Sequence, residues 1–200
     1  MKKISSIILL ISLFIIVGCK SNKTTAVNKK YINSDSLPTL IGRTTPDALL
    51  HKDFSDWYLD EYNSYIPDSK IIKKLKNRID LYTIEVFYGT WSEESKVLIP
   101  DLLKIIKLSH YPEKKLKMYA VNEKKQSFYG EDVQKKIIEI PTIIIYRNYD
   151  DKNGIRREVG RIIKEPSKKL EEDIYNYIDN FGAKHKKSKK KHKKFKKLNY

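Results

Sequence analysis

The chain has 200 residues, a single cysteine and a formal net charge of +16 at pH 7. One cysteine excludes an intramolecular disulfide, a redox-active cysteine pair and a metal site built from several cysteines. Ten lysines and no acidic residue lie between Lys184 and Lys197, which leaves +6 for the rest of the chain. The basic character therefore belongs mostly to the C-terminus.

The first residues are typical of an export signal. A basic start at 1–3 precedes an apolar run over 4–17, which ends at Gly18 and Cys19. An apolar core of about fifteen residues is too short for a membrane span and suits a secretory leader. The ending resembles the bacterial lipobox, and this implies that residues 1–18 are removed and that Cys19 carries a lipid. The alternative is that Cys19 is a leftover thiol of the leader.

Two segments precede the main domain. Residues 19–45 begin with Cys19 and continue as a polar, Lys/Ser/Thr/Asn-rich stretch with Pro and Gly breakers, which predicts a flexible tether. Residues 46–79 predict a helical extension, because their apolar positions recur at helical spacing and Pro67 separates two helices. We expect this extension to pack on the edge of the domain.

Residues 80–182 predict one α/β domain. Strands are expected over 81–88, 116–121, 140–147 and 155–163, helices over 93–109 and 166–182, a weakly helical polar region over 122–136, and a hairpin turn over 150–154. The β-α-β order implies a right-handed parallel crossover, which the last two strands extend as an antiparallel hairpin. Residues 183–200 predict a disordered Lys-rich tail.

Three short motifs occur in this domain in a definite order. They are Trp91-Ser92-Glu93-Glu94-Ser95 with Pro100 after it, Ile140-Pro141-Thr142 at the head of an apolar strand, and Val159-Gly160-Arg161 near the end of the last strand. Together they resemble the thioredoxin-like proteins over residues 78–182, and specifically the thioredoxin-like lipoproteins of Bacteroidetes-type bacteria. The resemblance implies a three-layer α/β/α sandwich with a mixed central sheet and a cis-proline loop at Pro141.

Ser92 and Ser95 occupy the positions at which the family carries its two redox cysteines. Thiol–disulfide exchange needs a thiolate, which a serine hydroxyl cannot replace. We therefore interpret Ser92 as the N-cap of the following helix, and not as a nucleophile. A serine nucleophile would need a histidine base. The four histidines (His51, His110, His185 and His192) are not placed by the sequence to serve as one.

The family's cis-proline loop lines a groove in which extended peptides dock. This resemblance implies a groove bordered by Trp91, Ser92, Ile140, Pro141 and Thr142, which could bind a peptide or protein partner without chemistry. The alternative interpretation is that Pro141 simply begins a strand, a position at which proline is permitted. Both interpretations stay open at this point.

The tail offers a second route to function. Its lysines could bind a polyanion, and behind an export signal the nearest ones are anionic lipid headgroups and lipopolysaccharide, so nucleic acid is not expected. His185 and His192 lack a third ligand, so no metal is expected, and no cofactor is implied.

The sequence thus predicts a redox-inactive, lipid-anchored thioredoxin-like module of the bacterial cell envelope, facing the periplasm. It would bind peptides or proteins through the groove and is not expected to be an enzyme. Two alternatives remain. One is membership of a thiol-disulfide oxidoreductase family by resemblance alone, and the other is a membrane-surface protein acting through its lysine tail.

Overall fold

A computed structural model describes residues 26–149 and 155–183. The predicted leader, the predicted lipidation site Cys19, the predicted turn over 150–154 and the tail from 184 onward lie outside the described residues. No helix within the described part of the chain is both long enough and apolar enough to cross a membrane.

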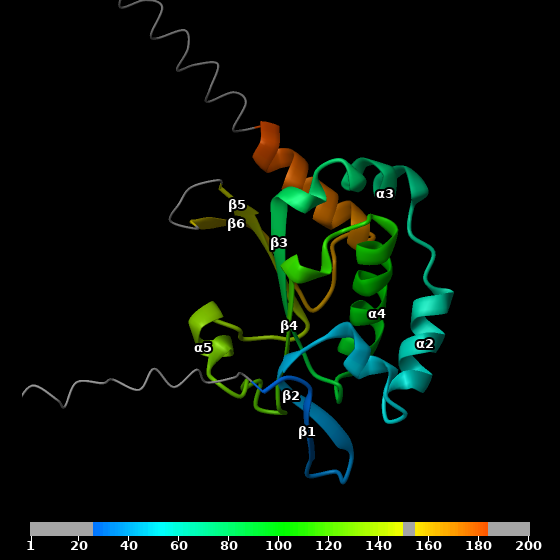
Figure 1. Ribbon diagram of the computed structural model, residues 1–200, viewed down its shortest axis with the longest axis vertical. Helices are drawn as coiled ribbons and strands as arrows, with labels where there is room; N and C mark the ends of the chain where they lie inside the picture. The colour runs from blue at the N-terminus through cyan, green and yellow to red at the C-terminus, as the bar shows by residue number, and fades with distance from the viewer. Residues whose placement is uncertain (1–25, 150–154, 184–200) are drawn as a thin grey trace, which may run out of the picture.

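The centre of the molecule is a six-stranded mixed sheet with the order β1-β2-β4-β3-β5-β6 (Figure 1). Strands β3 and β4 are parallel, and all other neighbours are antiparallel. The strands are β1 (Lys29–Ile32), β2 (Pro38–Thr44), β3 (Tyr82–Tyr88), β4 (Leu116–Ala120), β5 (Thr142–Asn148) and β6 (Arg156–Ile163).

Helices lie on both faces of the sheet. Helix α4 and the C-terminal helix cover one face, with α2 outside α4, and the short α5 lies on the other (Figure 1). The helices are α2 (Ser55–Ser64), α3 (Ser69–Lys76), α4 (Glu93–Leu108), α5 (Glu131–Lys135) and the C-terminal helix over 170–183, with 3-10 turns at η1 (Pro46–Leu50), η2 (Ile79–Leu81) and η3 (Glu113–Lys115). This arrangement is a thioredoxin-like α/β sandwich, and the predicted fold class is confirmed.

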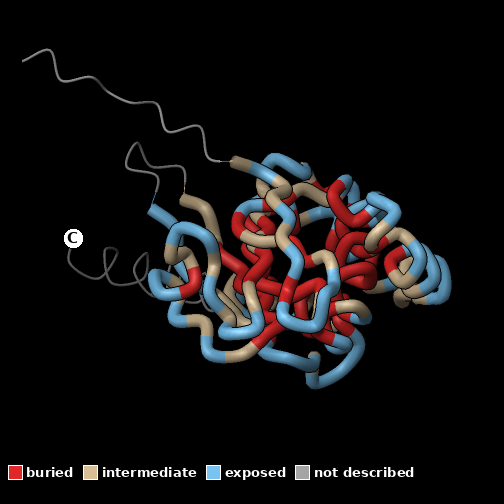
Figure 2. The backbone as a smooth tube through the Cα atoms, turned by 90° about the horizontal axis from the view of Figure 1, so that it is seen from below, coloured by how far each residue is buried: buried red, intermediate tan, exposed pale blue. Residues whose placement is uncertain are grey.

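The sheet separates two apolar clusters of different size. On the α4 face, Ile84, Val86 and Tyr88 of β3 join a large core that includes the C-terminal helix. On the α5 face, Phe87 joins a small cluster with only a few partners. Figure 2 shows the buried backbone gathered at the centre of the molecule with exposed segments around it. Because side chains alternate along a strand, β3 supplies both clusters at once.

The N-terminal part of the domain differs from the prediction. Residues 29–44 form a β-hairpin, and not the flexible tether expected over 19–45, because β2 pairs with β4 and extends the sheet. Leu40 is buried in the main core, and the hydroxyls of Thr44 and Tyr88 lie 3.0 Å apart in a buried hydrogen bond. The polar composition concealed a strand whose few apolar and threonine side chains point inward.

The hairpin is held against the loop that precedes α5. Gly42 has φ of +76°, and a Cβ built on it would lie 2.8 Å from the Cβ of Phe128. Glycine is the residue that tolerates both the left-handed backbone and this close approach. Gly130 has a similar φ of +77° but has nothing within 4 Å of its Cβ position.

A buried carboxylate cluster attaches the helical segment of 46–79 to the C-terminal helix. Glu171 is fully buried, and it accepts hydrogen bonds from the Tyr65 hydroxyl and, at 2.7 Å, from the Asp68 N–H. Asp101 of α4 lies near it, 7% exposed, with no hydrogen-bond partner for its Oδ1. Burial raises the pKa of Asp101 to about 7, and the nearby carboxylates of Glu61 and Glu171 add to this effect.

The two glycines of similar φ provide a matched test of the hairpin contact. We expect Gly42→Ala to lower the free energy of unfolding by about 2 kcal/mol or more, and Gly130→Ala by about 1 kcal/mol, because only the first adds a steric clash to the backbone penalty. Denaturant unfolding would measure both. Equal losses for the two variants would contradict the close packing of Gly42 on Phe128.

Asp101 should make the stability of the fold depend on pH. Because folding raises its pKa, the folded protein keeps a proton that the unfolded chain releases above its ordinary value of 3.8. Stability should therefore fall as pH rises from about 4 to about 7, by at most about 1.4 kcal/mol per pH unit, and then level off. Asp101→Asn should flatten this slope in denaturant unfolding across pH, whereas Asp60→Asn at an exposed position should not. The same slope in wild type and Asp101→Asn would refute this assignment.

Candidate functional site

Helix α4 begins at the motif that the sequence singles out. Ser92 is the N-cap, and its Oγ accepts a hydrogen bond of 3.2 Å from the Ser95 N–H. The Ser92 hydroxyl in turn donates to Glu94 Oε2 at 2.9 Å. A hydroxyl that accepts from the backbone and donates to a carboxylate fills both of its roles locally. The predicted capping role of Ser92 is thus what the structure shows.

Ser95 has a role that the sequence did not indicate. Its Oγ accepts a hydrogen bond of 3.2 Å from the Gly89 N–H, which lies just beyond the end of β3. Ser92 is 5% exposed and Ser95 is 1% exposed. The two hydroxyls therefore tie the end of the central strand to the first turn of α4. A signal for this existed in the Ser-x-x-Ser spacing, which places the second serine in the first helical turn.

The electrostatics at this helix end favour negative charge. Glu94 is exposed, and its pKa is lowered by a hydrogen bond from its own backbone N–H and by the hydrogen bond from Ser92. Acidic side chains in a first helical turn also suit the positive end of the helix dipole. The arrangement stabilises the start of the helix.

The two described histidines lie away from Ser92 and Ser95. His51 contacts Lys30 at 3.1 Å and Asp53 at 3.2 Å. His110 follows the end of α4, opposite the end that carries Ser92, with a left-handed backbone at φ of 55°. Neither ring has a hydrogen bond to Ser92 or Ser95 in the part of the chain that the structure describes. The same residues contain no group of three His, Cys, Asp or Glu side chains placed to hold a metal ion.

The structure brings the Trp91 loop and the proline loop together. The Ile140–Pro141 peptide is cis. A Cβ built on Gly89 would lie 2.7 Å from the Trp91 ring and 3.0 Å from Ile140 Cδ1, so both side chains press on this glycine. The Trp91 Nε1–H donates to the carbonyl of Val121 at 3.0 Å, which fixes the half-buried indole at this rim.

The predicted groove residues are more buried than the resemblance implies. Ile140 is 4% exposed and Thr142 is 2% exposed, and Pro141 is buried as well. Thr142 Oγ1 donates to the Glu139 carbonyl at 2.6 Å, and the carbonyl of Pro141 accepts from Lys164 N–H at 2.8 Å. These side chains therefore pack beneath the surface of the Pro141 loop and do not line an open groove.

One backbone position in the loop keeps its hydrogen-bonding capacity. The N–H and C=O of Ile140 make no hydrogen bond to any described residue. The hairpin also reaches this region, because the Leu40 N–H donates to Thr90 Oγ1 at 3.2 Å. The Pro141 loop is therefore also surrounded by Thr90, Leu40 and Lys164. The sequence did not indicate these residues, because their hydrogen-bond partners are distant in the chain.

Comparisons with known proteins find three solved structures of low similarity. A protein of unknown function from Pseudomonas aeruginosa is 14% identical, over 56% of this chain and 62% of that one, with a TM-score of 0.38. An HIV epitope-scaffold is 14% identical over 62% and 71% of the two chains, with a TM-score of 0.36. Mitochondrial thioredoxin 3 from Saccharomyces cerevisiae, in its oxidized form, is 19% identical over 60% and 98%, with a TM-score of 0.31.

The chain thus spans about three fifths of the length of the Pseudomonas protein. No protein-family model matches this chain, and no curated protein matches it either. The fold assignment accordingly rests on the strand order and on the placement of the helices.

The capping role of Ser92 can be tested by substitution. We expect Ser92→Ala to lower the free energy of unfolding by about 1 kcal/mol, because an N–H of the first turn loses its acceptor. Ser92→Thr keeps a hydroxyl and should retain most of the stability. Denaturant unfolding followed by tryptophan fluorescence would measure both variants, and an undiminished stability of Ser92→Ala would show that the hydroxyl is not the cap.

Proposed function

We propose that this chain is a redox-inactive thioredoxin-like module that binds an extended peptide or protein segment along the Pro141 loop. In this proposal Ser92 and Ser95 stand where the thioredoxin family carries its cysteines. The only cysteine of the chain is Cys19, which lies directly after the predicted leader and outside the thioredoxin-like domain. Without a thiol pair in the domain, thiol–disulfide exchange has no nucleophile and no resolving group.

The observation that carries the proposal is the unpaired backbone of Ile140. An extended peptide that lies beside this residue can donate to its carbonyl and accept from its N–H, as a strand added to a sheet does. The buried Ile140 side chain holds this residue in place, and the half-buried Trp91 offers an apolar surface next to it.

We further propose that the protein is anchored in the bacterial cell envelope through a lipid on Cys19, and faces the periplasm. The support is the leader pattern, with a basic start, an apolar run and a final Gly18-Cys19. A binding module at a membrane needs no transmembrane helix of its own, since a lipid and a second attachment can hold it there.

A second candidate function rests on the charge of the tail. Ten lysines between Lys184 and Lys197 would attract anionic lipid headgroups or lipopolysaccharide, at very roughly 1 kcal/mol per lysine near a charged surface. The thioredoxin-like domain would then be a carrier for the tail. This binding would weaken steeply with added salt, whereas peptide binding at Ile140 would change little.

Capture from an envelope extract separates the two candidates. We expect the chain cut after Gly182 to keep a partner that the full chain captures. Trp91→Ala should weaken this binding about tenfold or more, because the interface loses an aromatic anchor. Trp57→Ala, which alters the half-buried tryptophan of α2, is the matched control.

A second readout follows the backbone directly. Amide hydrogen exchange at Ile140 should slow when the captured partner binds, because its N–H then gains an acceptor. If every interaction disappears with the tail, or if Trp91→Ala and Trp57→Ala behave alike, the peptide-binding proposal is wrong.

A further inference from the structure

The central strand carries one charged side chain in its middle. Glu85 of β3 is 1% exposed, on the α5 face of the sheet. It pairs in register with Lys117 of β4 on one side and with Ile144 of β5 on the other. A buried carboxylate is costly unless cations compensate it, so its surroundings need an explanation.

Three cations from three different elements converge on this carboxylate. Arg156, the first residue of β6, donates from Nη1 to Oε1 at 2.7 Å. Lys135, the last residue of α5, places Nζ at 2.8 Å from Oε2, and Lys117 places Nζ at 3.4 Å from Oε1. Burial would raise the pKa of Glu85, but Lys135 and Arg156 more than offset this and hold the pKa below its usual value. The carboxylate therefore stays charged.

The cluster carries more positive charge than the carboxylate needs. Three cations against one carboxylate leave two positive charges. The neighbouring Arg161 does not enter this balance, because it is paired with Glu158 through bonds of 3.0 and 3.1 Å. One cation in good geometry would be enough to stabilise Glu85, so burial of this carboxylate does not by itself account for three.

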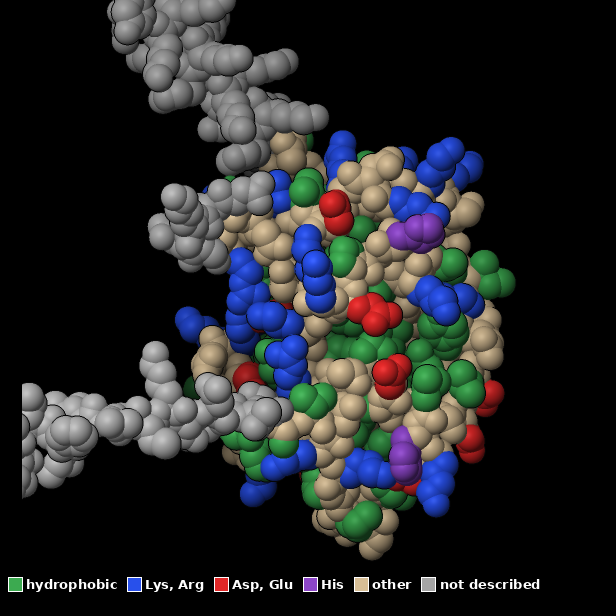
Figure 3. Space-filling model, in the orientation of Figure 1, with side chains coloured by type: hydrophobic (Ala, Val, Ile, Leu, Met, Phe, Trp, Pro, Cys, Tyr) green, Lys and Arg blue, Asp and Glu red, His purple; other side chains and the backbone are tan. Residues whose placement is uncertain are grey.

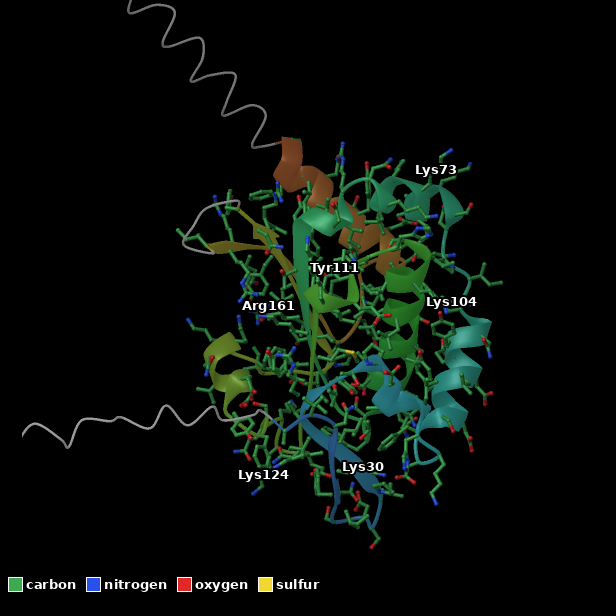
Figure 4. All side chains as sticks on the ribbon, viewed as in Figure 1. Lys30, Lys73, Lys104, Tyr111, Lys124 and Arg161 are labelled. Atoms are coloured by element: carbon green, nitrogen blue, oxygen red, sulfur yellow. The ribbon has the colours of Figure 1, made fainter. Side chains whose placement is uncertain are left out.

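The excess charge is accessible from solvent. The side chains of Lys117, Lys135 and Arg156 are 31%, 24% and 32% exposed. Figure 3 shows Lys and Arg side chains gathered on the side of the molecule that carries β6 and α5. Figure 4 places Arg161 at the same side, above α5. The three cations are thus partly exposed, whereas the Glu85 carboxylate that they share is buried.

Two of the three cations, Arg156 and Lys135, are also held in place by other contacts. The Arg156 guanidinium lies 5.2 Å from the centre of the Tyr146 ring, and Lys135 Nζ lies 4.7 Å from the same centre. Arg161 Nη1 donates to the Lys135 carbonyl at 3.1 Å and so fixes the end of α5 to β6. Three donors from different elements that share one buried carboxylate before any ligand binds form a preorganised site.

We propose that Lys117, Lys135 and Arg156 form a binding site for a phosphate monoester group, with Glu85 as the positioning residue that holds the three cations. A phosphate monoester carries close to two negative charges near neutral pH, which matches the two uncompensated positive charges. Its three terminal oxygens can each accept a charge-assisted hydrogen bond, one from each cation. The phosphate can belong to a soluble small molecule or to a lipid headgroup.

The first test titrates the full chain with inorganic phosphate by isothermal titration calorimetry. Lys117→Met removes one cation and keeps an apolar side chain, and it should weaken binding about tenfold or more, as expected for loss of a charge-assisted hydrogen bond. Lys73→Met makes the same change of charge on α3, on another side of the molecule (Figure 4), and should leave binding unchanged. Absence of saturable binding by the wild type, or equal loss in both variants, overturns the proposal.

A second variant separates positioning from simple attraction. Glu85→Gln raises the net positive charge of the cluster by one, so a merely electrostatic patch would bind phosphate more tightly. In the proposed site the cations lose their common anchor, and binding should become weaker. Thermal unfolding reports whether the variant folds, and Lys117→Met remains decisive if it does not. Tighter binding by folded Glu85→Gln would refute the positioning role.

The source of the phosphate is distinguished by vesicles. Vesicles of phosphatidylcholine with phosphatidic acid present the same monoester group on a membrane, and the lysine tail contributes equally to the binding of every full-chain variant. Binding that falls with Lys117→Met but not with Lys73→Met assigns the site to a lipid headgroup. If both variants bind vesicles as well as wild type does, while Lys117→Met still weakens the binding of inorganic phosphate, the ligand is a soluble phosphate. Unchanged binding of Lys117→Met in both assays would contradict the proposal.

Discussion

The fold depends on the burial of β3 along both of its faces. All seven residues of this strand are buried, so its side chains must satisfy a large core on the α4 side and a small cluster on the α5 side. Apolar side chains alone are enough for the large core on the α4 side. On the second face the strand carries Glu85, and the last residue of α5 and the first residue of β6 are both brought to it as ion-pair partners. A single carboxylate thus organises the side of the sheet that has little helical cover.

The end of the same strand is joined to helix α4 by two serine hydroxyls. The Ser95 hydroxyl accepts a hydrogen bond from the Gly89 N–H, and the Ser92 hydroxyl accepts one from the Ser95 N–H. Two hydroxyls therefore close the turn between the strand and the helix. Both are buried and both act on the backbone. These hydroxyls contribute to local stability, as other small polar side chains do at a helix N-cap. Thiol–disulfide exchange would instead need a thiolate.

The sequence predicted those parts of the structure that are encoded locally. The apolar run that forms β3, the Ser-x-x-Ser motif before α4 and the Ile-Pro-Thr motif before β5 each contain their own signal, and the fold class followed from their order. The hairpin of β1 and β2 was missed because its polar composition resembles that of a linker. Its order depends on β4, which supplies the pairing partner far along the chain.

The groups around Glu85 were missed for the same reason. Arg156 lies 71 positions from Glu85 in the sequence, and only the sheet register and the course of α5 bring the three cations together. The exposure of the groove residues was also overestimated. A motif predicts that a loop is present, but the packing of Ile140 and Thr142 beneath it depends on neighbouring segments.

The hairpin would also limit how far the domain can extend from the proposed lipid anchor. With the lipid on Cys19, as proposed above, the first strand of the sheet begins at Lys29, only ten residues later. A fully extended chain covers at most about 3.5 Å per residue, so this link reaches roughly 35 Å, against about 90 Å for a tether that continued to residue 45. The domain would then remain within about one protein diameter of the bilayer, so that it would meet any partner close to the membrane surface.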